Sequence, residues 1–135
     1  MSLRTDPVFT KPVAGAVSQV TLANTARDGS SNVVTVATGT ADGIRVDNVR
    51  IKAIVTTTAG MIRFFYSADS GTTNRLIGEV VVPAITVGAG VAGFEADWVP
   101  PGGYIDLVGT TDRLIASTHN AEAHNLYARQ ASYGA

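Results

Sequence analysis

Apolar and acidic residues alternate strictly in the segment Phe94-Glu95-Ala96-Asp97-Trp98. Successive side chains of a β-strand point to opposite faces of the sheet, so a period of two indicates a half-buried strand. The pattern places the three apolar side chains in a core and turns the two carboxylates toward solvent. We therefore expect an all-β fold built outward from this strand.

Turn signals separate further strand-forming runs along the rest of the chain, at intervals of about ten residues. They include Asp28-Gly29, Asp42-Gly43, Ser70-Gly71 and Pro100-Pro101-Gly102-Gly103. Strands are expected over residues 17–23, 33–38, 44–57, 61–67, 75–82, 92–99, 113–117 and 123–131, with a shorter segment at 104–108. About eight antiparallel strands without a long helix predict a single jelly-roll-like β-sandwich.

The longest expected strand, residues 44–57, changes phase within its length. Its apolar residues lie first at Ile44 and Val46 and then at Val49, Ile51, Ala53 and Val55. A change of parity needs one extra residue, so we expect a β-bulge near Asp47-Asn48. Pro83 cannot donate a ladder hydrogen bond, and the strand over 75–82 should end before it.

Composition excludes several classes of protein. The 135 residues suffice for one domain with its own core, and the absence of cysteine excludes disulfides and thiolate chemistry. Ten basic and eleven acidic residues give a net charge of −1, so we expect neither a nucleic-acid nor a membrane partner. Charged residues make up 16% of the chain, against about 25% in typical domains. That low share suggests a surface covered by partners.

Candidates for metal binding and nucleophilic catalysis are sparse. His119, Glu122 and His124 could supply three metal ligands, but a turn with side chains bonded to local backbone is the simpler interpretation. Ser117, Asp112 and a histidine could form a hydrolytic triad, but no G-x-S-x-G elbow is present. We expect no metal site, no cofactor and no enzymatic activity.

Two further patterns have a simple structural interpretation. Glu95 and Asp97 would lie about 7 Å apart on one strand face, a separation that suits glycosidase chemistry. Acids on the outer face of an amphipathic strand are, however, usually a solvated face. Gly88, Gly90 and Gly93 match G-x-G-x-x-G, but a strand follows instead of a helix. These glycines are therefore expected to permit a tight loop with positive φ.

Partner contacts are expected from basic and aromatic residues. Arg45, Arg50 and Lys52 form the densest basic group, and the predicted bulge lets all three point outward. Because arginine is favoured in interfaces, we expect them to pair with acids of a neighbouring subunit. Phe65 lies in an aromatic run with rings on both strand faces, so another sheet or another chain must cover one face.

The first sixteen residues are predicted to form an extended arm, followed by a sandwich domain over 17–135. Pro7 and Pro12 remove two backbone donors and disfavour helix before them. Leu3 and Phe9 are too few and too spread to form a core, so ordering the arm requires their burial against another subunit.

Four segments together resemble a family of small virion proteins of tailed bacteriophages and prophages. They are ANTARDG at 23–29, IRVD at 44–47, TTTAGMIRFF at 56–65, and ASTHNAE at 116–122 with Asn125. The resemblance spans roughly residues 20–130 and departs at 104–111. It implies a structural protein located in the virion, above all a capsid decoration (cement) protein. Such a protein would bind the shell as a homo-oligomer, with a trimer as our guess, and contact other head or tail proteins.

The alternative function is a carbohydrate-binding module associated with a tail or fibre. Trp98, Tyr104, Tyr127 and Tyr133 could stack on sugar rings. Trp98 nevertheless lies in the core phase of its strand, which disfavours this role.

Overall fold

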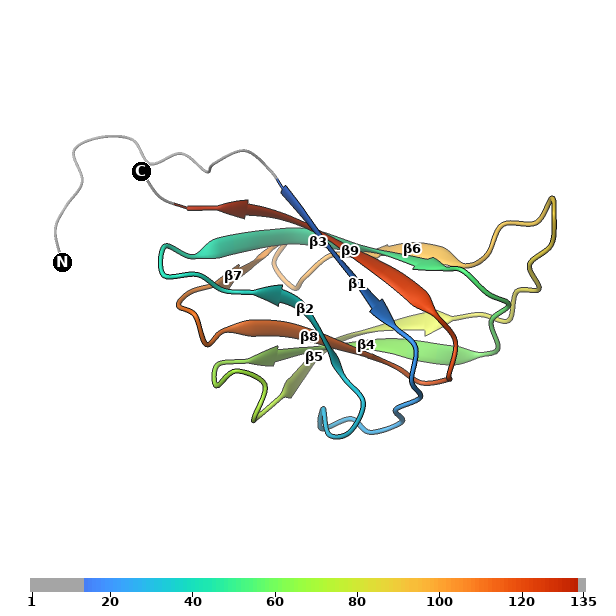
Figure 1. Ribbon diagram of the computed structural model, residues 1–135, viewed down its shortest axis with the longest axis horizontal. Helices are drawn as coiled ribbons and strands as arrows, with labels where there is room; N and C mark the ends of the chain where they lie inside the picture. The colour runs from blue at the N-terminus through green and yellow to red at the C-terminus, as the bar shows by residue number, and fades with distance from the viewer. Residues whose placement is uncertain (1–13, 134–135) are drawn as a thin grey trace, which may run out of the picture.

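Two antiparallel β-sheets pack face to face over residues 14–133, the part of the chain that this computed structural model describes (Figure 1). The strands are β1 (Ala14–Val20), β2 (Val34–Thr38), β3 (Ile44–Ala53), β4 (Gly60–Ser67), β5 (Arg75–Val82), β6 (Glu95–Trp98), β7 (Ile105–Leu107), β8 (Arg113–Thr118) and β9 (His124–Ser132). Sheet A has the order β1-β9-β3-β6, with β7 also paired to β3, and sheet B has the order β2-β8-β4-β5. The predicted all-β sandwich is confirmed.

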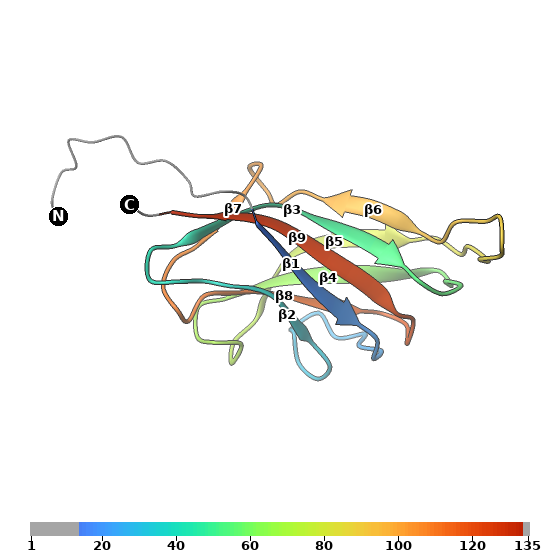
Figure 2. The same cartoon turned by 45° about the horizontal axis from the view of Figure 1, so that its top comes forward.

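The connections lie at the ends and outer faces of the sandwich. Residues 83–94 join sheet B to sheet A as a loop at one end (Figure 2). Gly93 in this loop meets the Ala53 carbonyl oxygen, which lies 2.8 Å from the position of an added Cβ. The predicted positive φ is wrong for Gly88, Gly90 and Gly93, because the left-handed glycines lie elsewhere. Close approach of backbone, rather than backbone handedness, accounts for the glycine at 93. No helix among the described residues could cross a membrane.

The phase change in β3 is a bulge, as predicted. Its register against β9 shifts between Val46 and Asn48, so Asp47 is the extra residue. Val46 and Val49 on either side are both fully buried. The bulge therefore keeps two runs of opposite parity on the core face of one strand. Strand β5 also ends at Val82, directly before the proline, as expected.

Two strand limits differ from the expectation. β3 ends at Ala53, and Val55 is 37% exposed, because the pairing with β6 and β9 stops at residues 52 and 53. One further backbone hydrogen bond, from the Ile54 amide to the Ala123 carbonyl, lies beyond this point. β1 begins at Ala14, so residues 14–16 belong to the sandwich and not to the predicted arm. Leu3 and Phe9 lie outside the described residues.

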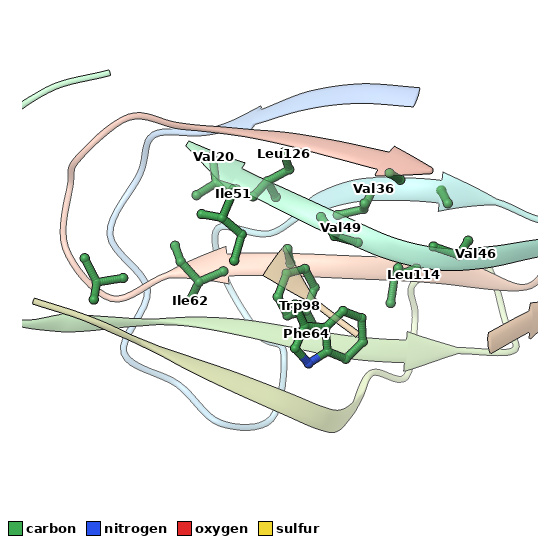
Figure 3. Packing of buried hydrophobic residues seen from close by; sticks show 14 of the residues in the cluster. Val20, Val36, Val46, Val49, Ile51, Ile62, Phe64, Trp98, Leu114 and Leu126 are labelled. Atoms are coloured by element: carbon green, nitrogen blue, oxygen red, sulfur yellow. The ribbon is translucent and has the colours of Figure 1, made fainter. Parts of the chain in front are cut away.

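The core between the sheets is centred on a pair of aromatic rings (Figure 3). Trp98 of β6 stacks on Phe64 of β4, with ring centroids 4.1 Å apart and an interplanar angle of 8°. Trp98 is 7% exposed and Phe94 is 8% exposed, while Ala96 is partly buried against the same cluster. The alternation at 94–98 thus correctly identifies the strand that closes the core, with Glu95 and Asp97 exposed.

Candidate interaction surfaces

The outer face of sheet A carries the three basic residues that we predicted from the sequence to contact a partner. Arg45, Arg50 and Lys52 project from β3 with side chains 37%, 48% and 39% exposed. Arg50 pairs with both acids of β6, at 3.1 Å to Glu95 and 3.1 Å to Asp97. Lys52 lies 3.5 Å from the Glu95 carboxylate. These acids belong to the same chain, so the cations have intramolecular partners, and their pairing with a neighbouring subunit stays a prediction.

Aromatic side chains border this charged group at the end near β7. Arg45 lies 3.0 Å from Asp47 and over the ring of Tyr104, with its guanidinium carbon 5.4 Å from the ring centroid. Tyr133 donates a 2.6 Å hydrogen bond to Asp106. Burial, followed by that hydrogen bond, raises the pKa of Tyr133 to about 12. The Tyr133 phenol therefore keeps its proton, and with it the hydrogen bond to Asp106, to a higher pH than an ordinary tyrosine does.

An exposed apolar strip lies on the β1 side of the same face, and we call it the β1–β9 strip. It consists of Gly15 and Val17 on β1 and Tyr127 on β9. Val17 and Tyr127 are direct cross-strand neighbours and are 72% and 47% exposed. A Cβ at Gly15 would lie 2.2 Å from a Tyr127 ring carbon, so the Tyr127 side chain occupies the space beside this glycine. The sequence could not identify this strip, because it depends on the pairing of two strands at opposite ends of the chain.

Phe65 is not a surface residue, which corrects the expectation that it contacts a partner. Phe65 and its cross-strand neighbour Ile115 are 0% and 2% exposed, and they lie on the face of sheet B turned away from the main core. The loop over residues 21–33 is anchored across this face. The ring is therefore buried by the chain itself and needs no other chain to cover it.

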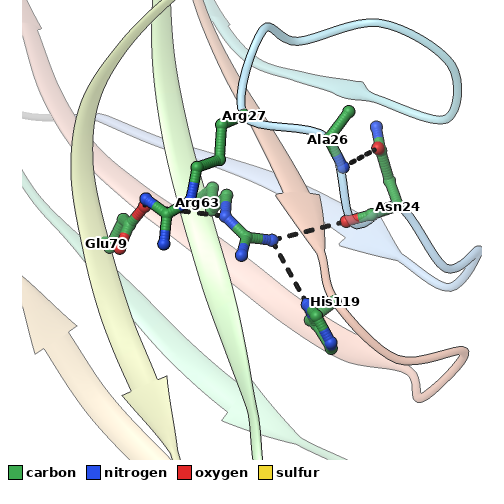
Figure 4. Close-up of polar contacts among 6 residues, drawn as sticks. All are labelled: Asn24, Ala26, Arg27, Arg63, Glu79 and His119. Carbon is green, nitrogen blue, oxygen red and sulfur yellow. Dashed lines mark hydrogen bonds and ion pairs between the residues drawn. The ribbon is translucent and has the colours of Figure 1, made fainter.

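A buried arginine fixes that loop to sheet B (Figure 4). Arg63 of β4 is 4% exposed, and its Nε lies 3.6 Å from the Glu79 carboxylate on β5. Its Nη1 lies 3.5 Å from the Asn24 carbonyl oxygen and 3.5 Å from His119 Nδ1. A guanidinium can only donate, so Nδ1 of His119 accepts. Arg27 of the loop pairs with the same Glu79 carboxylate.

Three of the four segments that carry the phage resemblance meet at this cluster. Residues 23–29 supply the loop, 56–65 supply the buried arginine, and 116–122 supply the histidine. Next to it, Asn120 donates to Thr58 Oγ1 at 3.0 Å, and the Glu122 carboxylate accepts from the Thr58 amide at 2.8 Å. These polar residues join loops to one another, which is a structural task.

The residues considered for metal or hydrolytic chemistry do not converge on one site. His124 is 1% exposed, and its Nδ1 donates to the Glu122 backbone carbonyl at 2.8 Å, while the Glu122 carboxylate binds Thr58. Ser117 is 1% exposed, and Asp112 accepts from the Val108 amide at 2.9 Å. No group of three His, Asp or Glu residues within 14–133 is arranged to hold a metal ion.

The four aromatic residues proposed to stack on sugars are dispersed. Trp98 is buried against Phe64, and Tyr133 is bonded to Asp106. Tyr104 is 49% exposed beside Arg45, and Tyr127 belongs to the β1–β9 strip. Only Tyr104 and Tyr127, of the four, have rings exposed enough to stack on a sugar.

A solved structure shows a weak likeness to this chain. No family model matches the chain, and no curated protein matches it. The structure contains the CBM22-1 and GH10 modules of endo-1,4-β-D-xylanase 10B from Clostridium thermocellum, complexed with xylohexaose, at 14% identity and a TM-score of 0.42. The likeness covers 89% of this chain and 26% of that one, so this chain spans about a quarter of the matched length. A likeness at this level decides nothing about function.

Proposed function

We propose that this chain is a structural protein of a tailed-bacteriophage virion that docks on a neighbouring protein of the particle through the outer face of sheet A. The β1–β9 strip is the observation that supports this function best. Val17, 72% exposed, and the Tyr127 ring beside it form an apolar patch that water would otherwise hydrate. An aromatic and apolar patch bordered by charged groups is the usual composition of a protein interface.

The charged part of the face suits association with another copy of the chain. Arg50 and Lys52 lie beside Glu95 and Asp97, so this group of four side chains has no net charge. Two such groups would not repel each other, and their ion pairs could exchange partners across an interface. On this basis the proposed role is a capsid decoration protein that binds the shell as a homo-oligomer.

Co-sedimentation with particles tests the docking. Particles lacking the chain, prepared from the phage or prophage that encodes it, are mixed with the purified protein and centrifuged. We expect the unchanged protein to sediment with them and Val17→Lys/Tyr127→Lys to remain in solution, because two lysines would have to be desolvated in the interface.

A matched control separates this effect from a general one of added charge. Val81→Lys changes a similarly exposed valine, 68% exposed on β5 of sheet B, and should sediment normally. Equal sedimentation of all three proteins, or equal loss in both variants, contradicts docking through sheet A. Light scattering on the same samples measures the oligomeric state. A monomer at every concentration contradicts the homo-oligomer.

A further inference from the structure

Strand β5 forms an open edge of sheet B. Among residues 14–133 it pairs with β4 alone, and no other backbone group bonds to residues 78–82. Successive residues of a strand direct their amide and carbonyl groups to opposite edges, so about half of those groups in β5 point away from β4. Such an edge is a template for one more strand.

Residues 78–82 lack the features that usually protect an edge. They pair with β4 without a register shift, since the shift lies just before them at Ile77. The run is Gly-Glu-Val-Val-Val, without lysine or proline. Its one charged residue, Glu79, pairs with Arg27 and Arg63. Val80 is only partly buried against the core. An apolar edge of this kind favours pairing with an added strand.

The other edges of the two sheets are less suited to an added strand. Strand β6 has four residues, and β2 is interrupted by a register shift between Thr35 and Ala37. Strand β1 lies beside β2 of the opposite sheet. Strand β5 is therefore the edge at which an added strand meets the fewest obstacles.

The start of the chain has the sequence pattern of a strand that fits such an edge. Leu3, Pro7 and Phe9 lie at odd positions, and the even positions from Ser2 to Thr10 are polar except for Val8. A period of two is typical of a strand with one apolar face. The pattern therefore predicts that Leu3 and Phe9 share a face when this segment pairs.

The two prolines determine which residues of this segment can bond to β5. A proline within a strand must direct its nitrogen away from the ladder. Pro7 is at an odd position, so the even-numbered residues bond to β5 and Pro7 lies on the outer edge. Pro12 is at an even position, so the pairing ends before it. Because Pro7 offers no donor on the outer edge, a further strand is disfavoured there.

The segment of the same copy is too short to reach this edge. Pairing of residues 2–10 leaves residues 11–13 to join Ala14, the first residue of β1, and that link spans at most about 14 Å. Strand β1 lies at the opposite edge of the sandwich from β5, three strand spacings and one sheet separation away. That distance is about 17 Å through the core and is longer around it. The added strand must therefore come from a second copy.

We propose that residues 2–10 of a second copy add to β5 as a fifth strand of sheet B. Leu3 and Phe9 pack on the side of β5 that carries Val80, and the assembly closes when every copy both gives and receives a strand. This inference rests on the proposed homo-oligomer, for which it names a contact. It does not depend on docking through sheet A, because β5 belongs to sheet B.

Two proline substitutions in the full chain test this pairing. Val8→Pro removes an amide that points to β5, whereas Thr5→Pro removes one that points away from it. We expect light scattering to give the mass of an oligomer for the unchanged chain and for Thr5→Pro, and the mass of a monomer for Val8→Pro. Val17→Lys/Tyr127→Lys should keep the mass of the unchanged chain, so loss of docking on the particle is distinguished from loss of strand exchange.

Hydrogen exchange locates the contact on the receiving copy. In the unchanged chain and in Thr5→Pro, the amides of residues 78–82 that point away from β4 should exchange at least about tenfold more slowly than in Val8→Pro. Amides in the ladder between β4 and β8 should exchange equally in all three proteins, which shows that the sandwich itself is intact.

Three outcomes would overturn the proposal. Equal masses for the unchanged chain and both proline variants, or a monomer in both variants, would show that the pairing series is not the one described. An oligomer in which residues 78–82 exchange as fast as in Val8→Pro would place the contact elsewhere. A monomeric unchanged chain with slow exchange at 78–82 would place the segment on its own sandwich, which contradicts exchange between copies.

Discussion

Removal of the Trp98 side chain is the sharpest test of the core. Trp98 is 7% exposed and stacks on Phe64 at 4.1 Å, so Trp98→Ala removes both buried area and an aromatic pair. Truncation of a buried aromatic residue to alanine typically costs about 3–5 kcal/mol, of which a stacked pair accounts for about 0.5–1.5 kcal/mol. We expect the free energy of unfolding to fall by about 4 kcal/mol.

Urea denaturation followed by far-UV circular dichroism measures this loss, because Trp98 is the one tryptophan of the chain and its fluorescence disappears with it. Trp98→Phe keeps a ring in the stack and should lose roughly half as much stability. A loss below about 1 kcal/mol for Trp98→Ala would refute the assignment of this ring to the core.

Gly78 allows the contact to be measured as a coupling. A Cβ on Gly78 would lie 2.4 Å from Trp98 Nε1 and 2.7 Å from the ring carbons Cε2 and Cζ2, so Gly78→Ala overlaps the indole. Gly78→Ala should destabilise the protein that has Trp98 and should have almost no effect on stability in the Trp98→Ala variant, where the ring is gone. Equal losses of stability in the two backgrounds would mean that the Trp98 ring does not pack against Gly78.

Three further predictions follow from buried groups and from the start of β1. Burial lowers the pKa of His124 below its ordinary value of 6.5. Just below pH 6.5 the histidine is therefore protonated in the unfolded chain and still neutral in the folded chain. The contribution of the neutral His124 to the free energy of unfolding is therefore full above pH 6.5 and is lost as the pH drops below it. Urea denaturation at a series of pH values should show that the free energy of unfolding depends less steeply on pH in His124→Gln. Glu79→Gln leaves Arg63 buried without its carboxylate and should lower the free energy of unfolding by about 1–2 kcal/mol. The amides of residues 21–33 should then exchange hydrogen faster, and unchanged exchange there would count against the anchoring role of Arg63. Deleting residues 1–16 should lower the melting temperature more than deleting 1–13, because only the longer deletion removes the first three β1–β9 pairs. Equal melting temperatures would show that these pairs contribute nothing.

Sequence patterns predicted those parts of the fold that depend on local alternation. The strand with Trp98, the bulge at Asp47 and the end of β5 at Val82 each follow from neighbouring residues and a steric rule. Val55 continued the apolar pattern of β3, but the strand ended because its ladder partners ended, which is a tertiary property. A strand pattern alone cannot state where the neighbouring strands stop.

The candidate surfaces were less predictable, for a similar reason. The outward direction of Arg50 followed from the pattern, but its pairing with Glu95 and Asp97 depends on which strand lies beside β3. The local pattern predicts a surface ring at Phe65, because it does not show that distant parts of the chain bury this side chain. The residues around Arg63 were singled out by resemblance alone, and their joint role became visible when three distant segments met.

Cryo-electron microscopy of the intact particle can show whether the sandwich docks on the virion through sheet A. We predict density for the sandwich on the virion, with the outer face of sheet A against a neighbouring protein and Val17 and Tyr127 within the contact. Particles without this density, or with the sandwich attached so that the β1–β9 strip faces solvent, would contradict it.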